Sequence, residues 1–380
     1  MAVQNTIGTH LEIPAGIREQ IVVVRMAMNR RKAVVILVPG FPATETETHW
    51  VPPVQSFVKA ITRRNPELAV HVVSFQYPFR RSRYVWHGAT IHGLRGRNRR
   101  FPYRFRTWIQ AAIEIRRLIR THDVIVIHSF WLAECAYVGS WVARLSGIKH
   151  IGYIQGQDAL LGNPYLKHLP LNKMTIVALS EKAADAFRGS TGRAVDQIIP
   201  IGLDADARGS LVEPAKRSID ILGVGWLSPI KRFPQFLDLI YRLKTDFPAL
   251  NCMIVGDGPG RAGLEHQIRQ NALEANVRLA GQLPREEVLS RMRNAKILLH
   301  TSYYEGQGYV FLEALASGMR VVSFDVGYAP KSANVYRCQS YGEMLGALRT
   351  LLAAPLQAQE IEVPNIDETA NAFEKLYGLN

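Results

Sequence analysis

The chain has 380 residues, enough for two domains that each bury a core. Hydrophobic residues make up 47% and charged residues 21%, which excludes a disordered or fibrous chain. No apolar run approaches the roughly 18 residues that a membrane span needs, and the N-terminal sequence lacks the blocks of a secretory signal. Cys135, Cys252 and Cys338 form no CxxC pair. We therefore expect a cytoplasmic protein without a disulfide framework or structural zinc.

Most of the positive charge lies in one segment. Between Arg80 and Arg120 there are twelve arginines, no lysine and one acidic residue, Glu114, so this segment contributes +11 of the net charge of +14. Aromatic residues such as Phe101 and Tyr103 are interleaved with the arginines. We expect the segment to contact an anionic surface at the inner face of a membrane, or the phosphates of an acceptor. A solvated loop is the alternative, and nucleic acid is the least favoured partner.

Strand-like apolar runs alternate with helical patterns along the first half of the chain. We expect strands at residues 33–38, 70–75, 123–129, 149–154, 175–180 and 197–202, and helices at 51–64, 108–120 and 132–146. The arginine-rich segment interrupts this alternation. The polar residues 204–217 indicate a linker.

A second series of strands and helices follows the linker. We expect strands at residues 219–224, 251–255, 277–280, 297–300 and 320–324, and helices at 234–247, 261–272, 285–294 and 309–317. Such alternation is typical of parallel βαβ units.

The predicted fold class is therefore α/β, with two Rossmann-like doubly wound domains that face each other across a cleft. Residues 1–203 would form an N-terminal domain that contains the arginine-rich segment 80–120. Residues 204–364 would form a C-terminal domain. Residues 365–380 would carry a last helix that either domain could receive. In open parallel sheets, ligands bind beyond the carboxyl ends of the strands, so the loops there are the places to look for chemistry.

The most informative loop lies in residues 300–318, HTSYYEGQGYVFLEALASG. Glu305 and Glu313 are eight residues apart around a predicted helix start, with Gly306 and Gly308 between them. Glycines let the backbone approach a ligand, a helix N-terminus attracts a diphosphate, and carboxylates accept hydrogen bonds from sugar hydroxyls. The pattern favours a nucleotide sugar over the alternative of a capped helix with surface acids.

Other strand ends supply further candidates. Lys231 and Arg232 follow the glycine-rich strand end at Gly225, where a cation can contact a phosphate. In the first half, Asp158 follows a strand and could bind a sugar hydroxyl or simply close a turn. His128 ends another strand, and we expect it to face the cleft, although a structural histidine is the more common case. No nucleophile–histidine–acid set and no HExxH metal motif occurs in the sequence.

Together these loops resemble the retaining glycosyltransferases of family four, which have the GT-B fold. The similarity is strongest over residues 219–326, which contain S-P-x-K, V-G-D-G-P-x-R-x-x-L-E, N-V-R-L-A-G and E-G-Q-G-Y-V-F-L-E-A-L-A-S-G in that order. It is weaker over residues 34–158, where the order of elements and a G-Q-D turn fit. The resemblance implies transfer of a hexose from a nucleotide sugar to a hydroxyl of a glycan or a lipid-linked acceptor, as in polysaccharide biosynthesis. It also implies that residues 1–203 form the acceptor domain and residues 204–364 the donor domain, and it implies no cofactor and no catalytic metal.

The resemblance also implies roles for individual residues. Glu305 near the donor sugar and Lys231 at the leaving diphosphate would be the catalytic pair. The implied donor-binding residues are Glu313, which would hold the ribose, Arg232 and Gly225, together with the backbone of Gly306, Gln307, Gly308, Tyr309 and Val310. Those implied on the acceptor side of the cleft are Gln155, Asp158 and His128.

Two positions depart from the family pattern. Trp226 stands where an arginine is common, and Gln155 stands where a histidine is common. A catalytically impaired binding protein of the same fold therefore stays an alternative, as does a sugar epimerase or phosphorylase of the same architecture.

Overall fold

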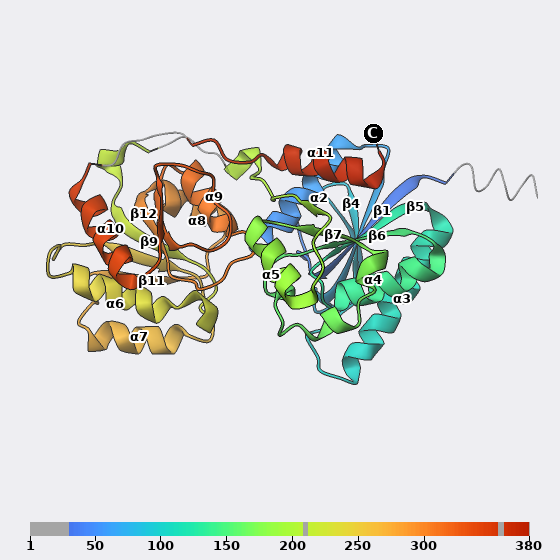
Figure 1. Cartoon of the computed structure of the whole chain (residues 1–380), viewed down its shortest axis with the longest axis horizontal. Coiled ribbons are helices and arrows are strands. Elements are labelled where there is room, and N and C mark those ends of the chain that lie inside the picture. Colours follow the sequence, from blue (N-terminus) through green and yellow to red (C-terminus); the bar gives the residue numbers. More distant parts are fainter. Residues whose placement is uncertain (1–29, 208–211, 356–360, 380) are drawn as a thin grey trace, which may run out of the picture.

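Two predominantly parallel sheets organise the chain, one in each half of the molecule (Figure 1). The structure, a computed structural model, describes residues 30–207, 212–355 and 361–379.

The N-terminal sheet has the strand order β3-β4-β2-β1-β5-β6-β7-β8, and only β3 runs antiparallel to its neighbour. Its strands are β1 (Lys32–Gly40), β2 (Ala69–Tyr77), β3 (Ser82–Trp86), β4 (Ala89–Gly93), β5 (Asp123–Phe130), β6 (Lys149–Tyr153), β7 (Thr175–Ala178) and β8 (Gln197–Ile198). The helices of the same half are α2 (Pro52–Arg64), α3 (Tyr103–Thr121), α4 (Glu134–Ser146) and α5 (Glu181–Thr191), with the 3-10 turns η1 (Gln157–Ala159), η2 (Pro164–Lys167) and η3 (Leu171–Lys173).

Alternation along the central strand explains how this sheet is covered on both faces. In β1, Val34 and Ile36 pack toward α2, whereas Val35 and Leu37 pack toward α3 and α4. All four are fully buried. Strands buried on both faces read as continuous apolar runs, which is why β1 is recognisable in the sequence.

The C-terminal sheet has the order β11-β10-β9-β12-β13-β14, and its neighbouring strands run parallel to one another. Its strands are β9 (Ile219–Val224), β10 (Cys252–Val255), β11 (Val277–Gly281), β12 (Ala295–His300), β13 (Arg320–Phe324) and β14 (Val335–Cys338). Its helices are α6 (Phe233–Leu243), α7 (Arg261–Gln270), α8 (Arg285–Arg293), α9 (Tyr309–Ala316) and α10 (Tyr341–Ala353), and η6 (Pro229–Lys231) precedes α6. The turns η4 (Ala205–Ala207) and η5 (Pro214–Lys216) lie in the expected linker.

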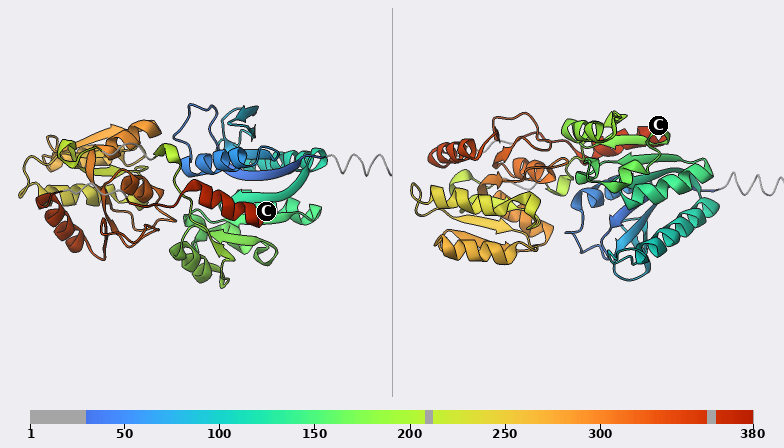
Figure 2. Two further views of the ribbon diagram at one scale, coloured as in Figure 1. Left: turned by 90° about the horizontal axis from the view of Figure 1, so that it is seen from above. Right: turned by 60° about the horizontal axis from the view of Figure 1, so that its bottom comes forward.

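The last helix, α11 (Ile366–Tyr377), returns to the N-terminal half, where it lies beside α2 (Figures 1 and 2). Phe373 is fully buried there, against Phe57 and Tyr153. Arg64 of α2 donates two hydrogen bonds of 2.8 Å to the carboxylate of Glu374. Of the two domains left open for this helix, the structure therefore selects the N-terminal one.

The arginine-rich segment has more structure than the sequence indicated. It contains the β3–β4 hairpin, and β4 continues the sheet by pairing in parallel with β2. No helix among the described residues has the length and the apolar character to cross a bilayer.

Candidate active site

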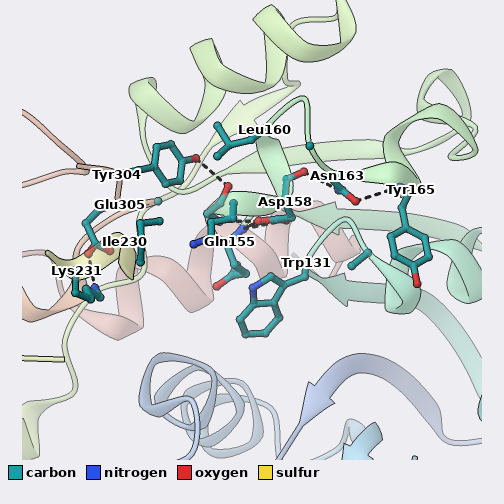
Figure 3. A pocket seen from close by; sticks show the side chains of 15 residues that line it. Trp131, Gln155, Asp158, Leu160, Asn163, Tyr165, Ile230, Lys231, Tyr304 and Glu305 are labelled. Atoms are coloured by element: carbon teal, nitrogen blue, oxygen red, sulfur yellow. Dashed lines mark hydrogen bonds and ion pairs between the residues drawn. The ribbon is translucent and has the colours of Figure 1, made fainter. Parts of the chain in front are cut away.

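Loops from both halves of the chain surround a cavity of about 670 Å³ (Figure 3). The N-terminal half contributes Trp131 after β5 and the Gln155–Asp158 turn after β6. The C-terminal half contributes Lys231 from η6 and the loop that contains Glu305. The cavity thus lies beyond the carboxyl ends of strands from both sheets, as expected for ligand sites in this kind of fold.

Glu305 is the centre of a charged group on the C-terminal side of this cavity. One oxygen, Oε1, accepts hydrogen bonds from Lys231 Nζ and from His300 Nε2, the latter at 2.8 Å. Burial alone would raise the pKa of Glu305, but the His300 hydrogen bond and the Lys231 charge lower it to about 2. Burial lowers the pKa of His300, so a neutral ring with its proton on Nε2 fits the contact. The structure thus brings together the predicted catalytic pair and adds His300, which the sequence interpretation missed.

Glu313 lies in a second cavity of about 360 Å³, which Gly225, Trp226 and Arg285 also line. Its Oε1 is 3.2 Å from both Nε and Nη2 of Arg285. Burial raises the pKa of Glu313, and Arg285 works against that rise. Sequence reasoning missed Arg285, although its position at the start of a helix after a strand was a usable signal.

The loop between the two carboxylates holds the halves of the chain together. Gly306 O accepts a hydrogen bond of 2.6 Å from Ser180 Oγ. A Cβ on Gly306 would lie 2.2 Å from Gln155 O, so only glycine allows this approach. Gly308 has φ of 77°, a left-handed conformation that suits glycine, and α9 begins directly after it.

The side chain of Gln307 makes hydrogen bonds with the N-terminal half. Its Nε2 donates to Ile201 O at 2.6 Å, and its Oε1 accepts from Ile201 N at 2.8 Å. Both ends of the amide are therefore used in joining the C-terminal half to the end of the N-terminal half. The side chain therefore has a structural role, and donor binding by the backbone of this loop stays a prediction.

Three further residues that were predicted to bind the donor, Arg232, Tyr309 and Val310, lie in different environments. Arg232 lies over the ring of Tyr303, 4.7 Å from its centroid, and lines neither of the two cavities. The Tyr309 hydroxyl is 3.4 Å from Arg285 Nη2. Val310 packs against the core around α9.

On the acceptor side, Gln155 and Asp158 line the first cavity. The Asp158 carboxylate accepts backbone hydrogen bonds from Gly156 at 2.6 Å, Leu132 at 2.8 Å and Gln155 at 3.1 Å. The Asp158 side chain therefore closes the turn, which is one of the two roles that the sequence left open, the other being the binding of a sugar hydroxyl.

The prediction that His128 faces the cleft is wrong. Side chains alternate along β5, and Val126, His128 and Phe130 all point toward α2 and α11. His128 is fully buried, and its Nδ1 lies 2.6 Å from the hydroxyl of Tyr377. It belongs to the core.

Among the described residues, no three His, Cys, Asp or Glu side chains are grouped so that they could hold a metal ion.

Two Rossmann-like domains that face each other across a shared cavity constitute the GT-B fold, which confirms the predicted fold class. Solved structures agree. Sucrose-phosphate synthase from Thermosynechococcus elongatus superposes with a TM-score of 0.70 at 15% identity, over 92% of this chain and 99% of that one. Anabaena HepE in complex with UDP and glucose gives 0.65 at 16% identity, over 92% and 95%.

The sequence comparisons support a glycosyltransferase. The family model "Glycosyl transferases group 1" matches residues 210–337. The 2-deoxystreptamine glucosyltransferase of Streptomyces kanamyceticus is 24% identical over 331 residues, 79% of each chain. A human phosphatidylinositol N-acetylglucosaminyltransferase is 30% identical over 162 residues, and its gpi3 relative from Schizosaccharomyces pombe is 30% identical over 122 residues. These two matches span 42% and 31% of this chain, but only 33% and 27% of the relatives.

Proposed function

We propose that this protein transfers a hexosyl group from a nucleotide-sugar donor to a hydroxyl of a glycan or lipid-linked acceptor, with retention of configuration at the anomeric carbon. The observation that carries the proposal is the placement of Lys231 and Glu305 on the interdomain cavity, with Glu313 on the helix that follows the same loop. Retention rests on the resemblance to family four.

The proposed chemistry follows from where charge develops. The bond between the anomeric carbon and the diphosphate oxygen breaks, and the electron pair leaves with the diphosphate. The acceptor oxygen forms the new bond to the anomeric carbon, and its proton passes to the departing diphosphate oxygen. Lys231 would stabilise the negative charge that develops on the leaving group, and the Glu305 carboxylate beside the sugar would stabilise its positive character. The two groups neutralise each other before the donor arrives.

Glu313 would orient the nucleotide. Both contacts with Arg285 involve Oε1, which leaves Oε2 to accept hydrogen bonds from ribose hydroxyls. Arg285 would hold the carboxylate in place and keep it charged in its buried setting. The structure of HepE in complex with UDP and glucose supports a nucleotide and a sugar as ligands of this fold.

The first test is thermal stabilisation by UDP-, GDP- and ADP-sugars, followed by assay of sugar release. One nucleotide series should stabilise the wild type, by about 2.7 kcal/mol at a hundredfold excess over Kd. Glu313→Gln should lose most of this gain. Glu265→Gln is the matched control, because Glu265 is also paired with an arginine in the C-terminal domain but lines neither cavity. If no nucleotide stabilises the wild type, the proposal fails.

Trp226 supports the second candidate, a binding protein of the same fold without activity. Its side chain is exposed on the second cavity, where the family pattern has a cation. This candidate predicts nucleotide binding without sugar release. A sugar epimerase or phosphorylase would instead act on the donor without glycosylating an acceptor, which product analysis detects.

We further propose that the protein lies in the cytoplasm and contacts the anionic inner face of a membrane through residues 80–120. The exposed arginines and aromatic side chains of that segment support this contact. The names of the human and fission yeast relatives specify phosphatidylinositol, which supports a lipid-linked acceptor.

A further inference from the structure

Arginines of the loops before β3 and α3 and of the first turn of α3 surround a separate cavity of about 310 Å³. The four that line it are Arg81, Arg95, Arg99 and Arg106. Tyr103, Thr107 and Gln110 add polar groups from the same helix. Four cationic side chains around one cavity create a local potential that attracts an anion.

These charges lack compensation. Within the described ranges, none of the four arginines forms an ion pair with a carboxylate. The single acidic residue of the segment, Glu114, lies 2.9 Å from His92 Nδ1 and 3.9 Å from Arg117 instead. Like charges held this close repel one another, and a bound anion removes the repulsion.

The N-terminus of α3 adds to the positive potential. The first turn of this 19-residue helix contains no acidic residue, and Pro102 at its N-cap gives no side-chain cap. Cations at this end oppose the helix dipole, whereas an anion there would be stabilised by it. The placement of Arg106 is thus unfavourable in isolation but favourable around a bound anion.

The backbone holds the loop in place. Arg95 has φ of 65°, a left-handed conformation that is uncommon for residues other than glycine. Gly96 N donates to Phe75 O at 2.8 Å, and a Cβ on Gly96 would lie 2.2 Å from Gln76 Oε1. The loop that carries Arg95 and Arg99 is therefore fixed against β2, which lowers the entropy cost of binding.

This cavity is distinct from the proposed donor site. It shares no lining residue with the two cavities of that site, and it follows β4, whereas the Gln155–Asp158 turn follows β6, four strands along the sheet. It lies wholly in the N-terminal half, whereas Lys231 belongs to the other half. In Figure 1, α3 runs along the side of the N-terminal domain that is remote from the C-terminal domain.

The surroundings of the cavity indicate what carries the anion. Phe101, Tyr103 and Phe105 are 79%, 61% and 52% exposed, and Phe79 near Arg81 is 47% exposed. Apolar rings beside a cationic cavity suit the boundary between lipid head groups and acyl chains. We propose that this cavity binds the phosphate group of a lipid head group while the neighbouring aromatic side chains enter the bilayer surface.

The test compares two double variants with equal loss of charge. Arg95→Gln/Arg99→Gln removes two arginines of the cavity, and Arg116→Gln/Arg120→Gln removes two exposed arginines from later turns of the same helix. Flotation is measured with phosphatidylcholine vesicles that contain phosphatidic acid, and with phosphatidylcholine vesicles that contain a fatty acid at matched surface potential. Calorimetry with inorganic pyrophosphate forms a separate arm.

The wild type should bind phosphatidic acid vesicles in preference to fatty acid vesicles. The cavity variant should lose this preference, with affinity lower by roughly tenfold for each arginine, and the control variant should keep it. Equal losses of vesicle affinity in the two variants would mean that the basic surface attracts the vesicle diffusely, and would overturn the proposal. Tight binding of pyrophosphate without binding of vesicles would also overturn it, because it would indicate a soluble ligand. The inference does not rest on sugar transfer. Thermal stabilisation by the nucleotide-sugar donor, measured in both variants, distinguishes a failure of the lipid-phosphate proposal from a failure of the proposed transferase function.

Discussion

At the scale of single residues, the charged state of Glu305 depends on its two neighbours. A buried carboxylate without partners would gain a proton more easily, yet His300 and Lys231 lower its pKa to about 2. Lys231 keeps Glu305 ionised, and it also faces the cavity in which we propose that the diphosphate binds.

Replacing Lys231 tests this double role. Lys231→Met should lower kcat/KM by roughly ten- to a hundredfold, the equivalent of one lost contact with a charged group. It should also raise the pKa of Glu305, so the acidic limb of the pH–rate profile should move to higher pH. Sugar transfer measured from pH 4 to pH 8 gives both values.

Arg232→Met is the matched control, because the neighbouring cation lies over Tyr303 rather than on the cavity. Its pH–rate profile should match that of the wild type. An unchanged acidic limb in Lys231→Met, or an equal shift in both variants, would contradict the assigned role.

Residue types at strand ends predicted part of this site, because a loop after a strand is visible in one sequence. Lys231, Glu305 and Glu313 were found in this way. The roles of His128 and Gln307 could not be predicted, since each depends on a partner far along the chain, Tyr377 and Ile201. A sequence shows which polar groups exist but not which of them already satisfy one another.

At the scale of elements, α11 packs into the core of the N-terminal half, although it follows the C-terminal half in the sequence. Phe373 is fully buried among aromatic rings of the N-terminal half, including Phe57 and Tyr153. The helix therefore stabilises a domain that lies more than a hundred residues earlier in the sequence.

Truncating this contact should destabilise the N-terminal domain. Phe373→Ala should lower the free energy of unfolding by about 3–5 kcal/mol, because it removes a buried ring and leaves a cavity. Urea unfolding followed by circular dichroism measures the change. Lys375→Ala, an exposed position on the same helix, should change it by less than about 0.5 kcal/mol. A loss below about 1 kcal/mol for Phe373→Ala would show that α11 docks only weakly.

Strongly periodic elements were predicted well, and short or atypical ones were not. The strand expected at residues 33–38 is β1, extended at both ends. The β3–β4 hairpin escaped notice because each strand has only five residues, and because β3 exposes Val85 as well as Arg83. Residues 234–247 predicted a longer helix than α6, which ends at Leu243 before a turn. The position of α11 could not be predicted, because one amphipathic face fits either domain.

At the scale of the whole molecule, buried histidines link stability to pH. Burial lowers the pKa of His71, His128 and His150 to about 3 and that of His92 to about 4. In the unfolded chain these rings titrate near pH 6.5. Between these values the unfolded chain binds more protons than the folded one, so stability is complete above about pH 6.5 and falls as the pH drops toward 3 or 4.

Each such histidine should contribute a slope of about 1.4 kcal/mol per pH unit to the free energy of unfolding near pH 5. His128→Phe keeps an aromatic ring in the core next to Phe373 and removes the titrating group. We expect its slope to be lower than that of the wild type by about this amount, although the lost Tyr377 contact lowers its stability at pH 7. His266→Gln, at an exposed position of the C-terminal half, is the control for the loss of a histidine. Equal slopes in the wild type and His128→Phe would mean that His128 gains its proton in the folded protein, and that the core around β5 opens before the chain unfolds.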